Sequence, residues 1–203
     1  MIRLSLEPDC RLAYEVQRTL FYPKVATQRE VFGLRCTDSR KGNFCIEIQE
    51  LGFAAAPASL MHMRAWVTNR GNSHQPVAFW LPGCPSGPVQ ARAIWHGDPP
   101  PLASSMGIPA NAPFSYSLKS VETMGPNTAI RIDFNWTQNP SRRNHTKIEY
   151  SGSIDLNPQD GLILDYRIAR KDTRMPRRND PPVDQKPKLV MQIRMRRLSK
   201  STG

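Results

Sequence analysis

The sequence has few of the residue patterns that build metal sites. It contains four cysteines, none of them in a C-x-x-C pair, and four histidines, none of them in an H-E-x-x-H spacing. A zinc ribbon needs the first pattern, and a helical zinc site needs the second. We therefore expect no bound metal and no cofactor.

Long apolar runs are also missing. No stretch of about 18 apolar residues occurs, so the sequence predicts no transmembrane segment. Glu7, Asp9 and Arg11 interrupt the N-terminal region, which is therefore not typical of a signal peptide. If Met1 is the native start, we expect a cytoplasmic protein. If a leader was removed, we expect an envelope or periplasmic protein.

Motifs for catalysis and nucleotide binding are absent. The sequence has no G-x-S-x-G, no G-x-x-x-x-G-K-[ST] and no G-x-G-x-x-G. Four carboxylates of the second half lie on the exposed parity of expected strands, where basic residues of neighbouring strands account for them as ion pairs. The carboxylates are Asp133, Glu149, Asp155 and Asp165, and the basic residues are Arg131, Lys147 and Arg167. We therefore expect a protein that is not an enzyme.

The sequence is rich in alternation instead. From Ala129 to Leu198, most extended runs place apolar side chains on one parity and polar side chains on the other. A period of two is typical of a strand with one buried face. The expected strands are Ile2–Leu6, Arg11–Phe21, Glu30–Cys36, Asn43–Leu51, Leu60–Thr68 (or a short helix), Val77–Leu81, Val89–Trp95, Phe114–Glu122, Thr128–Thr137, His145–Leu156, Leu162–Arg170 and Lys188–Leu198.

Short connections between these strands indicate antiparallel neighbours. Few helices are available to cover the apolar face, so we expect the sheet to cover itself as a sandwich or a curled half-barrel. The prediction is one all-β domain over residues 1–203, with about ten mostly antiparallel strands and little helix. A charged, proline-rich excursion at 171–187 precedes the last strand.

Positive charge is concentrated at the C-terminal end. Residues 167–203 hold 12 Lys or Arg against 3 Asp, whereas residues 1–166 hold 16 against 14. We expect this region to dock an acidic protein or a membrane surface, or to be a solvated basic tail. The candidate binding residues are Arg167, Arg170, Lys171, Arg174, Arg177, Arg178, Arg194, Arg196 and Arg197.

Nucleic acid is the alternative partner, through phosphate contacts within residues 167–200. Binding of single strands also uses exposed aromatic side chains for stacking. The aromatic residues of the second half instead share the apolar parity, as Phe134, Trp136, Tyr150 and Tyr166 do. The nucleic-acid signal is therefore electrostatic only.

The apolar face is the other candidate site, because a curled sheet can hold an apolar ligand on its concave side. Met61, Met63, Met106, Met191 and Met195 are adaptable lining residues, and the loop His96–Pro113 is a possible lid. A filled core without a cavity is the other interpretation of the same residues.

The segment from residue 114 to residue 170 resembles bacterial envelope β-proteins and, distantly, half-barrel lipoprotein carriers of the LolA type. The resemblance rests on paired long strands, the run Gly152-Ser153-Ile154-Asp155-Leu156, the turn at Asp160-Gly161 and the returning strand. It implies a non-catalytic binding role that includes acyl chains. The chain has no helices to plug a half-barrel, so no functional residue is carried over from that family.

Overall fold

The computed structural model describes a β-sheet protein. The residues described are 10–22, 24–40, 43–50, 65–66, 89–124, 127–141, 144–176 and 186–201.

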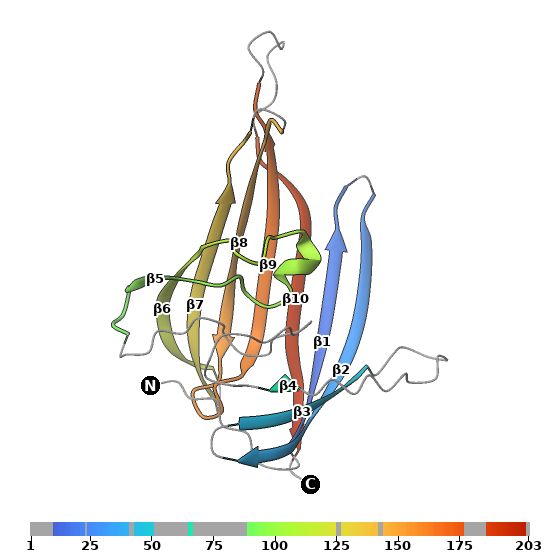
Figure 1. The fold of residues 1–203 in the computed structure, drawn as a ribbon, viewed down its shortest axis with the longest axis vertical. Helices are drawn as coiled ribbons and strands as arrows, with labels where there is room; N and C mark the ends of the chain where they lie inside the picture. Colours follow the sequence, from blue (N-terminus) through green and yellow to red (C-terminus); the bar gives the residue numbers. More distant parts are fainter. Residues whose placement is uncertain are drawn as a thin grey trace.

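Within the described residues, eight long antiparallel strands dominate the sheet (Figure 1). They are β1 (Arg11–Leu20), β2 (Ala26–Arg40), β3 (Asn43–Glu50), β6 (Phe114–Met124), β7 (Asn127–Gln138), β8 (Thr146–Leu156), β9 (Ile163–Arg174) and β10 (Lys188–Ser201). Two short strands, β4 (Ala65–Trp66) and β5 (Ile94–Gly97), pair with β3 and β6, and one 3₁₀ turn, η1, covers Ala103–Met106. The predicted all-β class with antiparallel pairing and little helix is confirmed.

The strand order is β4-β3-β2-β1-β10-β9-β8-β7-β6-β5. The first and last long strands, β1 and β10, therefore lie side by side in the middle of the sheet. β4 and β5 lie at its opposite ends and do not pair with each other, so the sheet is not closed into a barrel. The described strands supply one sheet, which leaves the sandwich form of the prediction unconfirmed.

Several strands differ from their expected bounds. β9 continues to Arg174 because Thr173 and Arg174 pair with the start of β8, so the expected excursion at 171–187 begins later. The strand expected at Val89–Trp95 is wrong for most of its length: residues 91–92 form a turn, Arg92 has φ 68°, and β5 starts at Ile94. The expected strands Ile2–Leu6 and Val77–Leu81, and most of Leu60–Thr68, lie outside the described residues.

One face of the sheet, here called the inner face, carries the core. Tyr14, Phe134, Tyr166, Ile168 and Ile193 are each at most 2% exposed. Phe134 stacks on Tyr166 across β7 and β9, with ring centroids 5.8 Å apart. Burying a side chain of this size contributes about 1.5–3 kcal/mol, so the inner face is the main source of stability. The alternation in the sequence therefore marks the buried face correctly.

Residues Asp98–Ala112, here called the strap, cross the inner face (Figure 1). Leu102, Met106 and Ile108 of the strap are buried in the same core cluster as the strands. Two tyrosines of the sheet hold its backbone: Tyr116 donates to the Asp98 carbonyl at 2.5 Å, and Tyr150 donates to the Met106 carbonyl at 3.5 Å. The loop predicted as a lid over an open face is thus packed into the core.

Gly152 marks a close approach inside the sheet. It lies on the inward parity of β8, directly opposite Phe134 of β7. A Cβ at this position would collide with the Arg167 carbonyl oxygen and lie 2.5 Å from Cζ of Phe134. The absence of a side chain lets the Phe134 ring cover the backbone here, which explains a glycine in a strand interior.

Candidate functional site: the basic outer face

The opposite side of β6–β10, here called the outer face, carries a row of polar residues set by strand register. Arg194 of β10 lies opposite Arg167 of β9, and Arg167 lies opposite Ser153 of β8. Ser153 in turn lies opposite Asp133 of β7. Strand residues of equal parity share a face, so the same alternation that buries the core aligns these groups.

Two arginines of this row share one carboxylate. Asp165 accepts from Arg167 Nη2 at 2.7 Å and Nε at 2.9 Å. It also accepts from Arg194 Nε at 3.0 Å and Nη2 at 3.3 Å. The Asp165 side chain is 15% exposed, whereas those of Arg167 and Arg194 are 50% and 43% exposed. One negative charge thus holds two guanidiniums side by side, and both remain accessible to solvent.

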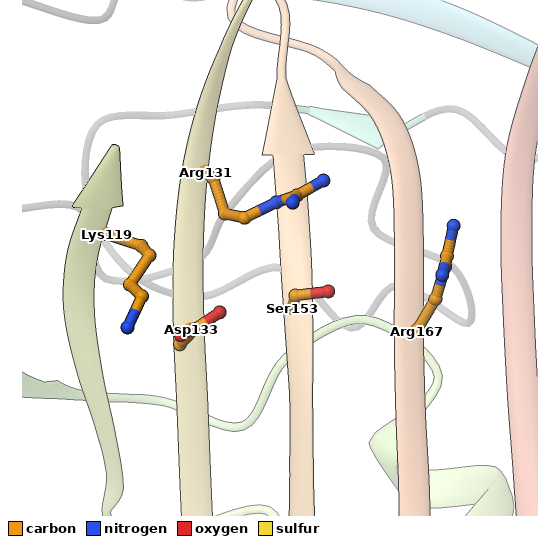
Figure 2. Close-up of a pocket in the computed structure, with 5 residues that line it drawn as sticks. All are labelled: Lys119, Arg131, Asp133, Ser153 and Arg167. Carbon is orange, nitrogen blue, oxygen red and sulfur yellow. The ribbon is translucent and has the colours of Figure 1, made fainter. Parts of the chain in front are cut away.

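A hollow of about 300 Å³ lies beside this pair, lined by Lys119, Arg131, Asp133, Ser153 and Arg167 (Figure 2). Its lining residues come from four consecutive strands, β6 to β9. The short Ser153 side chain leaves space between longer neighbours. Three of the five lining residues are cationic, so the hollow suits an anionic group better than a cationic one.

Arg131 is held at the rim of this hollow. Its Nε and Nη2 each donate to Asp155 at 2.8 Å, a bidentate ion pair across β7 and β8. Asp155 is buried, at 4% exposure. Figure 2 shows the Arg131 side chain reaching over β8 above Ser153. Asp133 has no ion-pair partner among the described residues, so its carboxylate remains available within the hollow.

The structure divides the predicted binding residues among several places. Arg167, Arg194 and Arg196 lie on the outer face, and Lys171 and Arg174 are exposed at the end of β9. Arg170 and Arg197 lie on the inner parity and form ion pairs there. Arg177 and Arg178 lie outside the described residues.

Arg197 belongs to the core of the molecule. Its Nη1 donates to Asp160 at 2.8 Å, and the two side chains are 9% and 3% exposed. Asp160 also accepts from the Leu162 backbone N–H at 3.0 Å, which ties the β8–β9 turn to β10. Nearby, Tyr14 donates to the Ile163 carbonyl at 2.9 Å. Burial raises the pKa of Tyr14, and the Arg197 charge opposes this shift.

Arg170 is also engaged on the inner parity. Its Nε and Nη2 donate to Asp172 at 2.8 and 2.9 Å. These bonds raise the pKa of the Arg170 guanidinium, against the opposing effect of burial. Arg170 lies opposite Tyr150, whose pKa is raised by burial and lowered by the Arg170 charge. Both groups are therefore occupied within the fold.

The expected carboxylate pairs form in part as predicted. Arg131 pairs with Asp155 across strands, but Arg167 pairs with Asp165, and Lys147 with Glu149, along one strand at a spacing of two. Lys119 and Ser153 were not candidates from sequence. The sequence could have indicated them only by parity, because both occupy outward positions of their strands but neither lies within a cluster of charged residues along the chain.

Comparison with known proteins gives no family. No family model matches the chain, and no curated protein matches it. The resemblance to half-barrel carriers therefore remains a prediction. Within the described ranges, no helix is long and apolar enough to cross a membrane, and no group of three or more metal-ligating side chains occurs.

Proposed function

We propose that this protein is a non-catalytic binding module that docks an acidic protein partner through its outer face. The observation that supports this most is the pair Arg167 and Arg194. Like charges directly opposite each other in a sheet destabilise it, and Asp165 offsets only one of the two. Guanidiniums bind carboxylates in a bidentate manner, so an acidic partner would compensate the remaining charge.

The surroundings of the pair extend the same surface. Arg196 is exposed and lies on the outward parity of β10, one residue pair along from Arg194. Lys119 and Arg131 bound the hollow on the other side of Arg167. An acidic side chain seated above Ser153 would meet three cations, from β6, β7 and β9, and one carboxylate, that of Asp133.

An acidic protein accounts for this surface better than nucleic acid does. The outer face presents arginines without stacking partners, because Phe134 and Tyr166 are buried on the inner face. Single-strand binding draws much of its affinity from such stacking. Nucleic acid is therefore the alternative partner, and the binding experiment below distinguishes it from an acidic protein.

The sequence also predicts an apolar ligand on the concave face of a curled half-barrel. We keep this as a second, separate part of the proposed binding role. Leu102, Met106 and Ile108 of the strap occupy the described part of the inner face. An acyl chain bound there would have to displace the strap, so we expect lipid to co-purify only if the strap moves. Mass spectrometry of the purified protein measures this directly.

The test compares two arginine pairs on the full chain. R167S/R194S removes the paired arginines, while R11S/R29S removes two exposed arginines from β1 and β2 and so lowers the net charge equally. The probes are a labelled polyglutamate peptide and a labelled single-stranded DNA, with binding followed by fluorescence anisotropy over a salt series.

We expect the peptide affinity of R167S/R194S to fall about tenfold or more, because each charge-assisted contact is worth about 1.5–3 kcal/mol. R11S/R29S should keep most of the affinity. Equal losses in the two variants would contradict a defined site. Tight DNA binding with no peptide binding would favour the nucleic-acid alternative.

A further inference from the structure

The turn between β1 and β2 exposes apolar side chains. Tyr22 is 74% exposed and Val25 is 71% exposed, and Leu20 at the end of β1 is 39% exposed. Leu189, at the start of β10, is 37% exposed. These four residues are here called the tip. Figure 1 shows the β1–β2 turn at the end of its hairpin, beside the upper part of β10.

The tip is held by the sheet. The Phe21 backbone N–H donates to the Val190 carbonyl at 2.9 Å, which continues the pairing of Leu20 with Met191. Tyr22, two residues beyond the end of β1, therefore lies at the level of Leu189 in the adjacent strand β10. This pairing brings the backbone of the turn next to the start of β10 at one end of the sheet.

Cations surround the tip. Lys24 lies within the turn, and Lys188 immediately precedes Leu189. Lys171 of β9 lies directly opposite Leu189.

Two carboxylates on the strands that lead to the tip, Asp172 and Glu30, already have basic partners. Asp172, opposite Lys188, accepts from Arg170 at 2.8 Å. Glu30 of β2 accepts from Arg18 at 3.1 Å. The described surroundings of the tip therefore keep a surplus of positive charge.

From this juxtaposition we propose that the tip docks onto an anionic lipid bilayer. Tyr22 and the aliphatic side chains suit the boundary between headgroups and acyl chains, where an aromatic ring with a polar end is favoured. Lysines beside such a site are attracted by an anionic leaflet, each by about fivefold in affinity. A flat negative surface meets cations from the turn, β9 and β10 at once, whereas a single acidic side chain meets one of them.

This site is independent of the proposed function. It uses neither Arg167 nor Arg194, which lie further along their strands on the outer face. One proposal can therefore fail while the other holds.

The experiment is co-sedimentation of the full chain with vesicles. One set contains phosphatidylcholine alone, and the other also contains phosphatidylserine. Y22S/V25S removes the exposed apolar tip, and the matched control I94S/V121S removes two equally exposed apolar side chains, 71% and 63%, from β5 and β6. K24Q/K188Q tests the charge separately.

We expect binding to the phosphatidylserine vesicles only, weakened about tenfold or more in Y22S/V25S by loss of apolar burial. I94S/V121S and R167S/R194S should bind as the unchanged protein does. K24Q/K188Q should lose about fivefold for each lysine. A tryptophan reporter, Tyr22→Trp, should shift its emission to shorter wavelength with these vesicles.

Three results would overturn the proposal. The first is no binding to either vesicle. The second is an equal loss in Y22S/V25S and I94S/V121S. The third is loss of polyglutamate binding in Y22S/V25S together with unchanged vesicle binding, since that would make the tip a protein contact.

Discussion

Arg196 and Arg197 are consecutive in β10 but have opposite environments. Arg196 is exposed on the outer face, whereas Arg197 is nearly buried on the inner face and donates to Asp160 at 2.8 Å. The same contrast separates Arg167, half exposed beside Asp165, from Arg170, held by Asp172. In a strand, one residue of displacement decides whether a basic side chain supports the fold or remains available to a partner.

The two faces also differ in how their charges are balanced. On the inner side, the buried Asp160 carboxylate accepts hydrogen bonds from one arginine, Arg197, and from the backbone N–H of Leu162. On the outer side, Asp165 is shared between two arginines that stay open to water. Inner pairs therefore contribute to folding, whereas outer pairs leave their guanidiniums exposed to solvent.

The largest difference between the two faces is expected when each of the two consecutive arginines is removed in turn. Arg197→Ala leaves the buried Asp160 carboxylate without its cationic partner and should lower the free energy of unfolding by about 3 kcal/mol or more. Arg196→Ala should change it by less than about 0.5 kcal/mol. Urea unfolding measures both. A small effect of Arg197→Ala would show that the inner pair is not structural.

The strap gives the second test. Met106 is 2% exposed against the inner face, and Val121 on β6 is 63% exposed. Met106→Ala should cost about 2–5 kcal/mol by loss of burial and creation of a cavity. Val121→Ala should cost less than about 1 kcal/mol, mostly through strand propensity. Thermal unfolding measures both variants. Equal losses of stability would mean that packing of the strap against the sheet contributes little to the stability of the fold.

Alkaline pH tests the burial of the inner tyrosines. Burial raises the pKa of Tyr14 and of Tyr166 in the folded state. The unfolded chain ionises near pH 10 while these folded phenols keep their protons, so stability is unaffected below that pH and falls above it. The expected loss is at most about 1.4 kcal/mol per pH unit for each tyrosine. Urea unfolding at pH 9 and above measures it, and an unchanged slope in Y14F/Y166F would contradict this origin.

The same two tyrosines differ in their hydroxyls. Tyr14 donates to the Ile163 carbonyl, whereas the buried Tyr166 hydroxyl has no hydrogen-bond partner among the described residues. Tyr14→Phe should cost about 1–2 kcal/mol, because a buried carbonyl loses its donor. Tyr166→Phe should be neutral or slightly stabilising. Chemical unfolding measures both variants. A larger loss of unfolding free energy in Tyr166→Phe than in Tyr14→Phe would contradict this assignment of the stabilising hydroxyl to Tyr14.

The smallest effect is expected on the outer face. Arg194→Ser removes a half-exposed ion pair and also relieves the repulsion from Arg167, so the two contributions nearly cancel. The free energy of unfolding should change by less than about 1 kcal/mol. A larger loss, measured by urea unfolding, would make the arginine pair a structural feature and weaken the case for a binding site.

Much of the fold follows from local pattern. The alternation of β7, β8 and β10 predicts both their extents and their buried sides, as Ile132, Ile154 and Ile193 show. The charge surplus at the C-terminal end is equally visible in the sequence. What the pattern missed was the strap, since Pro100, Pro101 and their small neighbours suggest an exposed loop but lie buried against the sheet.

The candidate site was predictable only in part. Arg167, Arg194 and Arg196 follow from parity, but nothing local showed that Arg167 and Arg194 would share Asp165. Pairing of β1 with β10 was also not foreseeable, because it joins residues at opposite ends of the chain. It places β10 between β1 and β9 in the middle of the sheet, so we expect deletion of residues 171–203 to destroy the fold.

The sequence by itself determined most of the long strands, their buried and exposed sides and the location of the positive charge. These properties depend on side-chain period and composition, which are local. Only the tertiary structure decided which arginines remain open to a partner, because that depends on carboxylates brought in by other strands and turns. Asp160 reaches Arg197 across 37 positions and Asp165 reaches Arg194 across 29, and no local rule fixes such contacts.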